Sequence, residues 1–120
     1  MEKEIDYDID LPSQNIYESK CPVLYALDIV GQKWKLPIIW YLARKDAIRY
    51  NELKRTVKGI TNMMLTKSLQ ELEVDKLITR TQYDTIPPQV EYSLTEMGKA
   101  LLPALNELYK WGTEQMELDK

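Results

Sequence analysis

The sequence predicts a mainly helical α+β domain with one small β-hairpin. Two observations support this fold class. Apolar residues recur every three or four positions over most of residues 22–76 and again after residue 95, which is the period of a helix. Over residues 78–83 and 90–94 the period falls to two and β-branched residues become frequent, as in paired strands. A chain of 120 residues is most simply one domain.

Two helices are expected first. Pro22 suits the first position of a helix, apolar residues follow at helical spacing, and Gly31 ends the segment. Residues 34–42 are apolar on nearly all sides, so we expect this second helix to be buried. Pro37 must lie in its first turn, because further along it would remove a backbone hydrogen bond.

Two more helices follow a short strand at residues 47–49. Residues 50–57 form about two turns, with Leu53 and Val57 facing inward. Residues 58–60 make a turn, after which the Thr61 hydroxyl can cap a helix from Asn62 to about Lys76.

The strands at 78–83 and 90–94 form a hairpin with a long loop, and Thr95 caps one last helix. That helix has a wide apolar stripe, which suggests that a partner covers it. We expect an arm at residues 1–20, the main domain at 21–112, and the end of the last helix or a tail at 113–120.

Composition excludes several classes of function. The chain has one cysteine and no histidine, so an intramolecular disulfide, a zinc site of Cys and His ligands and histidine-based catalysis are excluded. No cofactor, metal site or catalytic residue is indicated. The sequence contains neither a signal peptide nor an apolar run of about 20 residues, which predicts a cytoplasmic protein without a membrane span.

Charge is uneven along the chain, although the net charge is −3. Residues 33–80 have 11 basic and 5 acidic side chains, a net charge of +6 between acidic ends. A basic centre is typical of a surface that binds an anion such as DNA, although an ordinary solvated surface is the alternative.

The order of helices, tight turn and hairpin matches a winged helix-turn-helix, in which the second helix of the unit lies in the major groove. Amide, lysine and threonine side chains, which can contact base edges, occur on its outward side. The candidate base-reading residues are Asn62, Met63, Thr66, Lys67 and Gln70. The candidate phosphate-binding residues around them are Lys54, Arg55, Lys58, Thr61 and Arg80. Each alone could be an ordinary surface residue.

From Cys21 to Trp111 the chain resembles the HxlR-type family of winged helix-turn-helix regulators, relatives of the MarR group. The most specific matching segments are residues 31–35 (GQKWK), 50–53 (YNEL), 64–66 (MLT), 69–73 and 87–95 (PPQVEYSLT). Pro37 departs from the family pattern, which has an aliphatic residue there. The resemblance implies a transcription regulator, not an enzyme, that binds double-stranded DNA as a homodimer assembled by its terminal helices.

We expect the dimer interface to include Leu105, Leu108 and Trp111 and the operator to be an inverted repeat. No small-molecule effector is indicated. Cys21 is a candidate redox sensor, because a helix N-terminus and Lys20 would favour its thiolate. The resemblance also implies this role, since some HxlR-type proteins respond to oxidants or electrophiles through such a cysteine. The alternative is a small residue that fills space.

Two other functions compete with DNA binding. A winged-helix module that binds protein would share the fold but would not need the basic centre. An enzyme using carboxylates is the third hypothesis, although no pair of acidic residues forms a recognisable catalytic motif.

Overall fold

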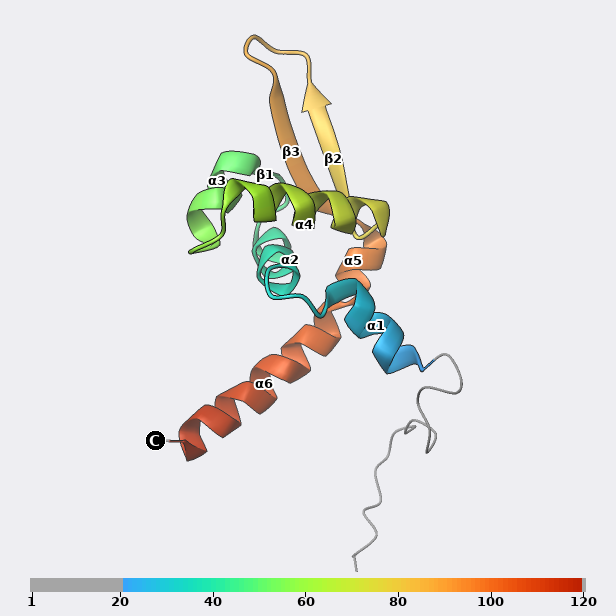
Figure 1. The fold of residues 1–120 in the computed structure, drawn as a ribbon, viewed down its shortest axis with the longest axis vertical. Helices are drawn as coiled ribbons and strands as arrows, with labels where there is room; N and C mark the ends of the chain where they lie inside the picture. The colour runs from blue at the N-terminus through green and yellow to red at the C-terminus, as the bar shows by residue number, and fades with distance from the viewer. Residues whose placement is uncertain (1–20, 120) are drawn as a thin grey trace, which may run out of the picture.

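The computed structural model describes residues 21–119, so the expected arm at 1–20 lies outside the described residues. Figure 1 shows a body of packed helices with a hairpin projecting from one end. The elements are α1 (Pro22–Val30), α2 (Lys35–Arg44), β1 (Ile48–Arg49), α3 (Tyr50–Thr56), α4 (Asn62–Val74), β2 (Ile78–Tyr83), β3 (Gln89–Leu94), α5 (Glu96–Ala100) and α6 (Leu102–Leu118).

The core lies between α2, α3, α4 and the sheet. Leu53 of α3 and Leu65 and Leu72 of α4 are fully buried against Ile38 and Ile39 of α2. Burying each such side chain contributes about 1.5–3 kcal/mol. The three helices of this core therefore hold one another in place, and α4 cannot move without disturbing the other two.

The predicted start signals of the helices are confirmed. Pro22 occupies the first turn of α1, and Pro37 lies in the first turn of α2. The Thr61 hydroxyl accepts a hydrogen bond of 3.1 Å from the backbone N–H of Met64. Gly59 has a φ of 86° in the turn before Thr61, a conformation that glycine adopts without the steric cost of a side chain.

The end of α4 corrects the expected boundary at Lys76. The helix ends at Val74, and Lys76 follows with a left-handed φ of 64°. The backbone N–H of Leu77 then donates to the carbonyl of Leu72 at 3.0 Å, and that of Lys76 donates to Glu73 at 3.0 Å. This pair of bonds closes the helix in a Schellman motif, usually made with glycine in the left-handed position.

The hairpin is the predicted pair of strands, with Ile78 opposite Leu94 and Tyr83 opposite Gln89. The short strand β1 joins it as a third strand on the other side of β3, where Ile48 pairs with Tyr92. That pairing was not predicted. It ties the segment before α3 to the base of the hairpin. We call the whole hairpin (residues 78–94) the wing.

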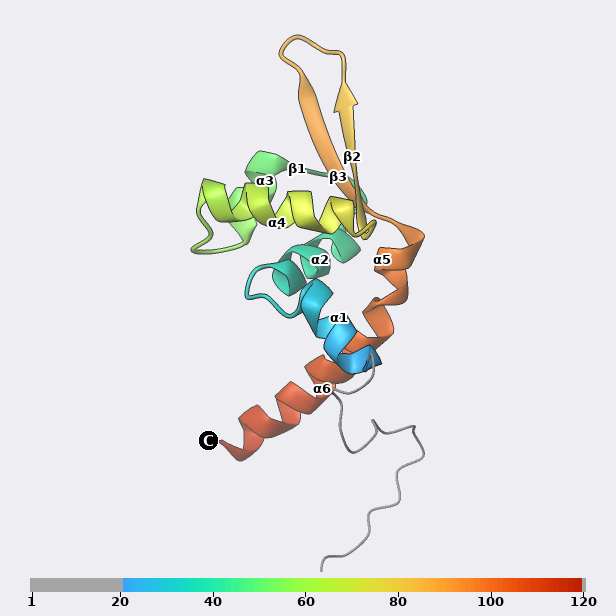
Figure 2. The ribbon, with the colours of Figure 1, turned by 45° about the vertical axis from the view of Figure 1, so that its right-hand side comes forward.

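The last helical segment differs from the expectation of one helix. It is divided into α5 and α6 at Leu101, two residues before Pro103 in the first turn of α6. Pro103 has no backbone N–H, and its ring would clash with a carbonyl of the preceding turn if α5 continued. As a result α6 leaves the body at a new angle, together with α1 on the side opposite the wing (Figures 1 and 2).

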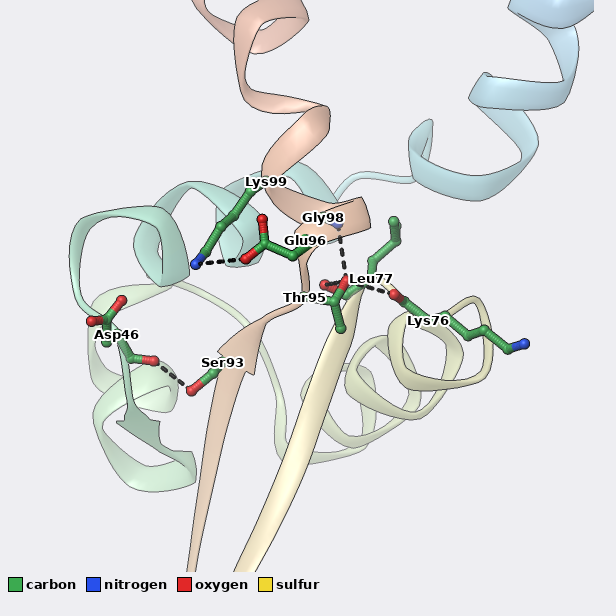
Figure 3. A network of polar contacts seen from close by, with 8 residues as sticks. All are labelled: Asp46, Lys76, Leu77, Ser93, Thr95, Glu96, Gly98 and Lys99. Carbon is green, nitrogen blue, oxygen red and sulfur yellow. Dashed lines mark hydrogen bonds and ion pairs between the residues drawn. The ribbon is translucent and has the colours of Figure 1, made fainter.

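A set of hydrogen bonds around Thr95 joins α4, the wing and α5 (Figure 3). The Thr95 hydroxyl lies 2.7 Å from the carbonyl oxygen of Lys76 and accepts from the N–H of Gly98 at 3.0 Å. Gly98 packs against the Leu77 carbonyl, where a Cβ atom would not fit. The base of the wing is therefore fixed relative to the end of α4.

Candidate DNA interface

The most outward side chains of α4 form a stripe opposite its buried leucines. Met63, Lys67 and Gln70 are all exposed, and 78% of Met63 is accessible. Their spacing of four and three residues puts them on one side of the helix. A polarisable, a cationic and an amide side chain are thus available together on this face.

Asn62 and Thr66 lie on the flank of α4 nearest α3, where they meet Tyr50. The Tyr50 hydroxyl is 3.0 Å from the Thr66 hydroxyl, 3.1 Å from the Asn62 carbonyl oxygen and 3.3 Å from Asn62 Oδ1. Sequence analysis did not identify Tyr50. Tyr50 is 12 residues from Asn62 and 16 residues from Thr66 in the sequence, so no local pattern indicates these contacts.

The candidate phosphate-binding residues lie on two sides of α4. Lys54 is half-buried and Arg55 exposed on α3, and Lys58 is exposed in the turn before α4. Arg80 is exposed on β2, beyond the other side of the helix, where it approaches Gln82 at 3.5 Å. The fifth, Thr61, already uses its hydroxyl oxygen as the cap of α4.

A groove separates α4 from the wing. Its volume is about 410 Å³, and its lining includes Tyr50, Thr66, Gln70, Glu73 and Arg80. It brings two candidate base-reading residues, one candidate phosphate-binding residue and Tyr50 to one surface.

A second polar hollow, of about 530 Å³, lies beside β1 and α3. It includes Lys45, Arg49 and Arg55, of which the first two were not singled out from the sequence. Lys45 forms an ion pair of 3.0 Å with Glu52, so part of its charge is already balanced.

A buried ion pair attaches α4 to α2. Lys35 Nζ lies 2.8 Å from Glu71 Oε2, and the exposed fractions of the two side chains are 2% and 33%. The hydrogen bond from Lys35 is the main cause that lowers the pKa of the Glu71 carboxyl below its usual value. Desolvation opposes this shift, and the charges of Lys35 and Lys67 add to it. Glu71 is therefore ionised and fixes one side of α4.

The candidate interface residues of α6 are placed differently from one another. Leu108 and Trp111 are 57% and 63% exposed. Leu105 is only 7% exposed and packs in the core of its own chain, so little of its side chain is available to a partner. Tyr109 stacks on Trp40 with ring centroids 6.0 Å apart, which attaches α6 to α2.

Cys21 is a free, buried cysteine at the residue before α1. Its carbonyl accepts from the N–H of Tyr25 at 2.9 Å. Over residues 21–119, no group of three Cys, His, Asp or Glu side chains is arranged to hold a metal ion. No helix within the same range is long and apolar enough to cross a membrane.

Comparison with known proteins gives consistent matches. The model of the HxlR-like helix-turn-helix family matches residues 29–120. A Fusobacterium mortiferum protein that bears the name regulatory protein MalR is 48% identical over 106 residues, covering 88% of this chain and 98% of its own.

Solved structures of transcription regulators are also similar to this chain. The redox regulator HypR in its reduced form has a TM-score of 0.76 and 39% identity over 81% of this chain and 95% of its own. Its oxidised form is also known. Reduced YodB from Bacillus subtilis, a transcriptional regulator, has a TM-score of 0.69 and 32% identity over 78% of this chain and 91% of its own. A diamide-treated form of YodB has been solved too.

Proposed function

The chain belongs to the HxlR-like helix-turn-helix family of transcription regulators, and from this premise we propose that it recognises a specific sequence of double-stranded DNA as a homodimer. In this proposal α4 enters the major groove, and the side chains of α3, the following turn and the wing contact the flanking phosphates. Regulation of transcription, not catalysis, is then the role of the protein.

The exposed stripe of Met63, Lys67 and Gln70 is the observation that supports this proposal most. Gln can donate to and accept from adenine, and Lys can donate to guanine. All three side chains are exposed to solvent, which is the arrangement that a base-reading face requires. A module that binds protein would not need cations on both sides of such a helix.

The flanking cations give the proposal a measurable electrostatic signature. Each lysine or arginine that neutralises a phosphate releases counterions, so DNA affinity falls with salt. Changing Lys54, Arg55, Lys58 and Arg80 together to Gln should flatten the salt dependence by about one unit per residue. A matched control changes Lys110 of α6, on the side away from the wing, to Gln. An unchanged slope in the quadruple variant would place DNA elsewhere on the molecule.

The dimer is supported by exposed apolar side chains on the terminal helices. Tyr25 and Leu27 of α1 are 59% and 53% exposed, and Leu108 and Trp111 of α6 are more than half exposed. These helices lie opposite the wing (Figure 1), so a partner on this side would leave α4 free. Two copies related by a two-fold axis would read an inverted repeat.

The dimer is tested by sedimentation. Wild type should sediment as a dimer at micromolar concentration, and Leu108→Glu with Trp111→Glu should give a folded monomer with weakened DNA binding. A wild-type monomer with full DNA affinity would contradict the proposed assembly.

The decisive experiment for the function selects duplexes from a random DNA library with the purified wild-type protein. We expect the retained duplexes to share an inverted repeat with half-sites about one helical turn, or a small multiple of it, apart. Recovery of unrelated duplexes bound with equal affinity would exclude sequence-specific recognition.

A second proposed property is a response to oxidants through Cys21. It is favoured by the similarity to the redox regulator HypR and by the position of Cys21 immediately before α1. Cys21 itself is 7% exposed, so the reaction requires the start of α1 to move. In this reaction the Cys21 thiols of two protomers lose two hydrogens and form one intersubunit disulfide, while the N=N bond of diamide accepts both hydrogens. A mixed disulfide with a small thiol is the alternative product.

Because Cys21 lies near the proposed interface, such a modification would bias the relative orientation of the two reading helices. Diamide should change the DNA affinity of wild type and leave that of Cys21→Ser unchanged. An unchanged wild type, or an equal change in both proteins, would make Cys21 a structural residue.

A further inference from the structure

Tyr50 links the two helices of the helix-turn-helix unit at the edge of the candidate reading face. It is the first residue of α3, and its ring is half-buried beside the groove between α4 and the wing. Its hydroxyl approaches both Thr66 and Asn62 of α4, at 3.0 Å from the Thr66 hydroxyl and 3.1 and 3.3 Å from two oxygens of Asn62. Two candidate base-reading residues thus share one internal partner.

This contact limits what Thr66 offers to a ligand. A threonine in a helix divides its side chain between two rotamers, because its hydroxyl can also bond to a carbonyl of the preceding turn. The bond to Tyr50 selects the rotamer in which the hydroxyl faces α3. The hydroxyl is then used inside the protein, and the methyl group is what remains for an outside contact.

The same contact limits Asn62. A phenol has one proton to donate, and both Asn62 atoms near it are oxygens, so it can donate to either of them. With Oδ1 held toward Tyr50, the amide directs its NH₂ group away from α3. Asn62 then offers its NH₂ group as a hydrogen-bond donor. It does not offer the amide oxygen and NH₂ together, which a bidentate contact with adenine requires.

We propose that Tyr50 is a positioning residue that sets the base preference of the N-terminal half of α4. The inference rests on the proposed DNA recognition by α4. Tyr50 turns the Thr66 methyl toward the 5-methyl group of a thymine, and it turns the Asn62 NH₂ toward an acceptor on a neighbouring base edge. A phenylalanine at residue 50 would fill the same space without imposing either preference.

The test uses the duplex selected by wild-type protein, with each thymine of the half-site replaced in turn by uracil, which lacks only the 5-methyl group. At one position of the half-site, we expect the change from thymine to uracil to lower the affinity of wild type about fourfold. This factor corresponds to the burial of one methyl group. Tyr50→Phe should lose less than about twofold at that position, because its Thr66 rotates freely.

Two substitutions of Thr66 separate its methyl from its hydroxyl. Thr66→Val keeps a methyl in place and should retain the uracil penalty of wild type, which is the loss of affinity when thymine is replaced by uracil. Thr66→Ser lacks the methyl and should show no such penalty. Tyr92→Phe is the matched control for Tyr50→Phe. Tyr92 lines the same groove, and within residues 21–119 its hydroxyl makes no hydrogen bond to α4. This control should behave as wild type.

Affinity for a scrambled duplex and the melting temperature report on the fold, and both should match wild type in Tyr50→Phe. If wild type selects a sequence but Tyr50→Phe retains the full uracil penalty, the role of Tyr50 is refuted while the proposed function stands. An equal loss on the selected and scrambled duplexes would also refute it, since that is the mark of a structural defect. If wild type selects no sequence, the proposed function and this inference fail together.

Discussion

The buried ion pair between Lys35 and Glu71 predicts an asymmetry between its two partners. Glu71→Ala leaves an ammonium group that is 2% exposed without its counter-ion. Lys35→Met leaves a carboxylate that is 33% exposed, which water can still reach, and puts an apolar chain of similar length in the buried space. Removing the carboxylate should therefore cost far more than removing the lysine.

The magnitude follows from the exposure of each group. Loss of one partner from a fully buried pair costs about 3–5 kcal/mol. Asp28 and Asp75 line the same hollow as Lys35 and Glu71 and can partly compensate the unpaired, buried ammonium, so we expect about 3 kcal/mol for Glu71→Ala. For Lys35→Met we expect at most about 1 kcal/mol, because the remaining Glu71 carboxylate is 33% exposed and water can solvate its charge.

Urea unfolding followed by circular dichroism at pH 7 measures both variants, with protein concentration held constant because dimers gain stability with concentration. Equal losses in the two variants, or no loss in Glu71→Ala, would refute this account of the pair.

The lowered pKa of Glu71 makes the same pair dependent on pH. A carboxyl whose pKa is lower in the folded state contributes stability above its unfolded pKa, about 4.3 for glutamate. That contribution is lost as the pH falls through the lower, folded pKa. The stability advantage of wild type over Glu71→Gln should therefore be constant from pH 7 to about 5 and shrink in more acidic solution.

Three further substitutions test the packing and the helix ends, each through the free energy of unfolding. Leu53→Ala removes a fully buried side chain and should cost about 2–5 kcal/mol; a loss below 1 kcal/mol would show that the site collapses around the cavity. Thr61→Ala removes the cap of α4 and should cost about 1 kcal/mol, whereas Thr61→Ser should be nearly neutral. Lys76→Gly relieves the left-handed φ and should stabilise the protein by up to about 1 kcal/mol; destabilisation would mean that the Lys76 side chain has a packing role.

Local patterns in the sequence predicted much of the fold. The change of period from 3.6 to 2 located β2 at residues 78–83, as observed. Pro22, Thr61 and Thr95 marked helix starts because each acts on backbone groups within its own turn. These signals are short-range, and tertiary packing did not override them.

Features that depend on tertiary contacts were missed. The break at Leu101 was overlooked because the apolar stripe continues across it, although Pro103 was a local warning. Leu105 and Leu108 belong to the same apolar stripe in the sequence, yet only Leu105 is buried in the core, whereas Leu108 is exposed. The burial of Lys35 follows from the position of Glu71 on another helix, and no periodicity in α2 indicates it.

In the candidate site, the outward positions of Met63, Lys67 and Gln70 followed from helical geometry alone, and their exposure agrees with it. The internal engagement of Asn62 and Thr66 did not follow, because it requires the position of Tyr50 across the turn. Sequence periodicity thus located the face, and the packing of α3 decided which groups on that face are free.

The central claim is that the outward face of α4 reads base edges, and Gln70→Ala tests it most directly. Gln70 is exposed and neutral, so its removal leaves the net charge, and with it the release of counterions, unchanged. The measurement is the ratio of affinities for the selected and the scrambled duplex, with Gln115→Ala on the exposed surface of α6 as the control. The account predicts that Gln70→Ala loses about 1–3 kcal/mol on the selected duplex and nothing on the scrambled one, while the control matches wild type. An unchanged ratio, or equal losses on both duplexes, would contradict the claim.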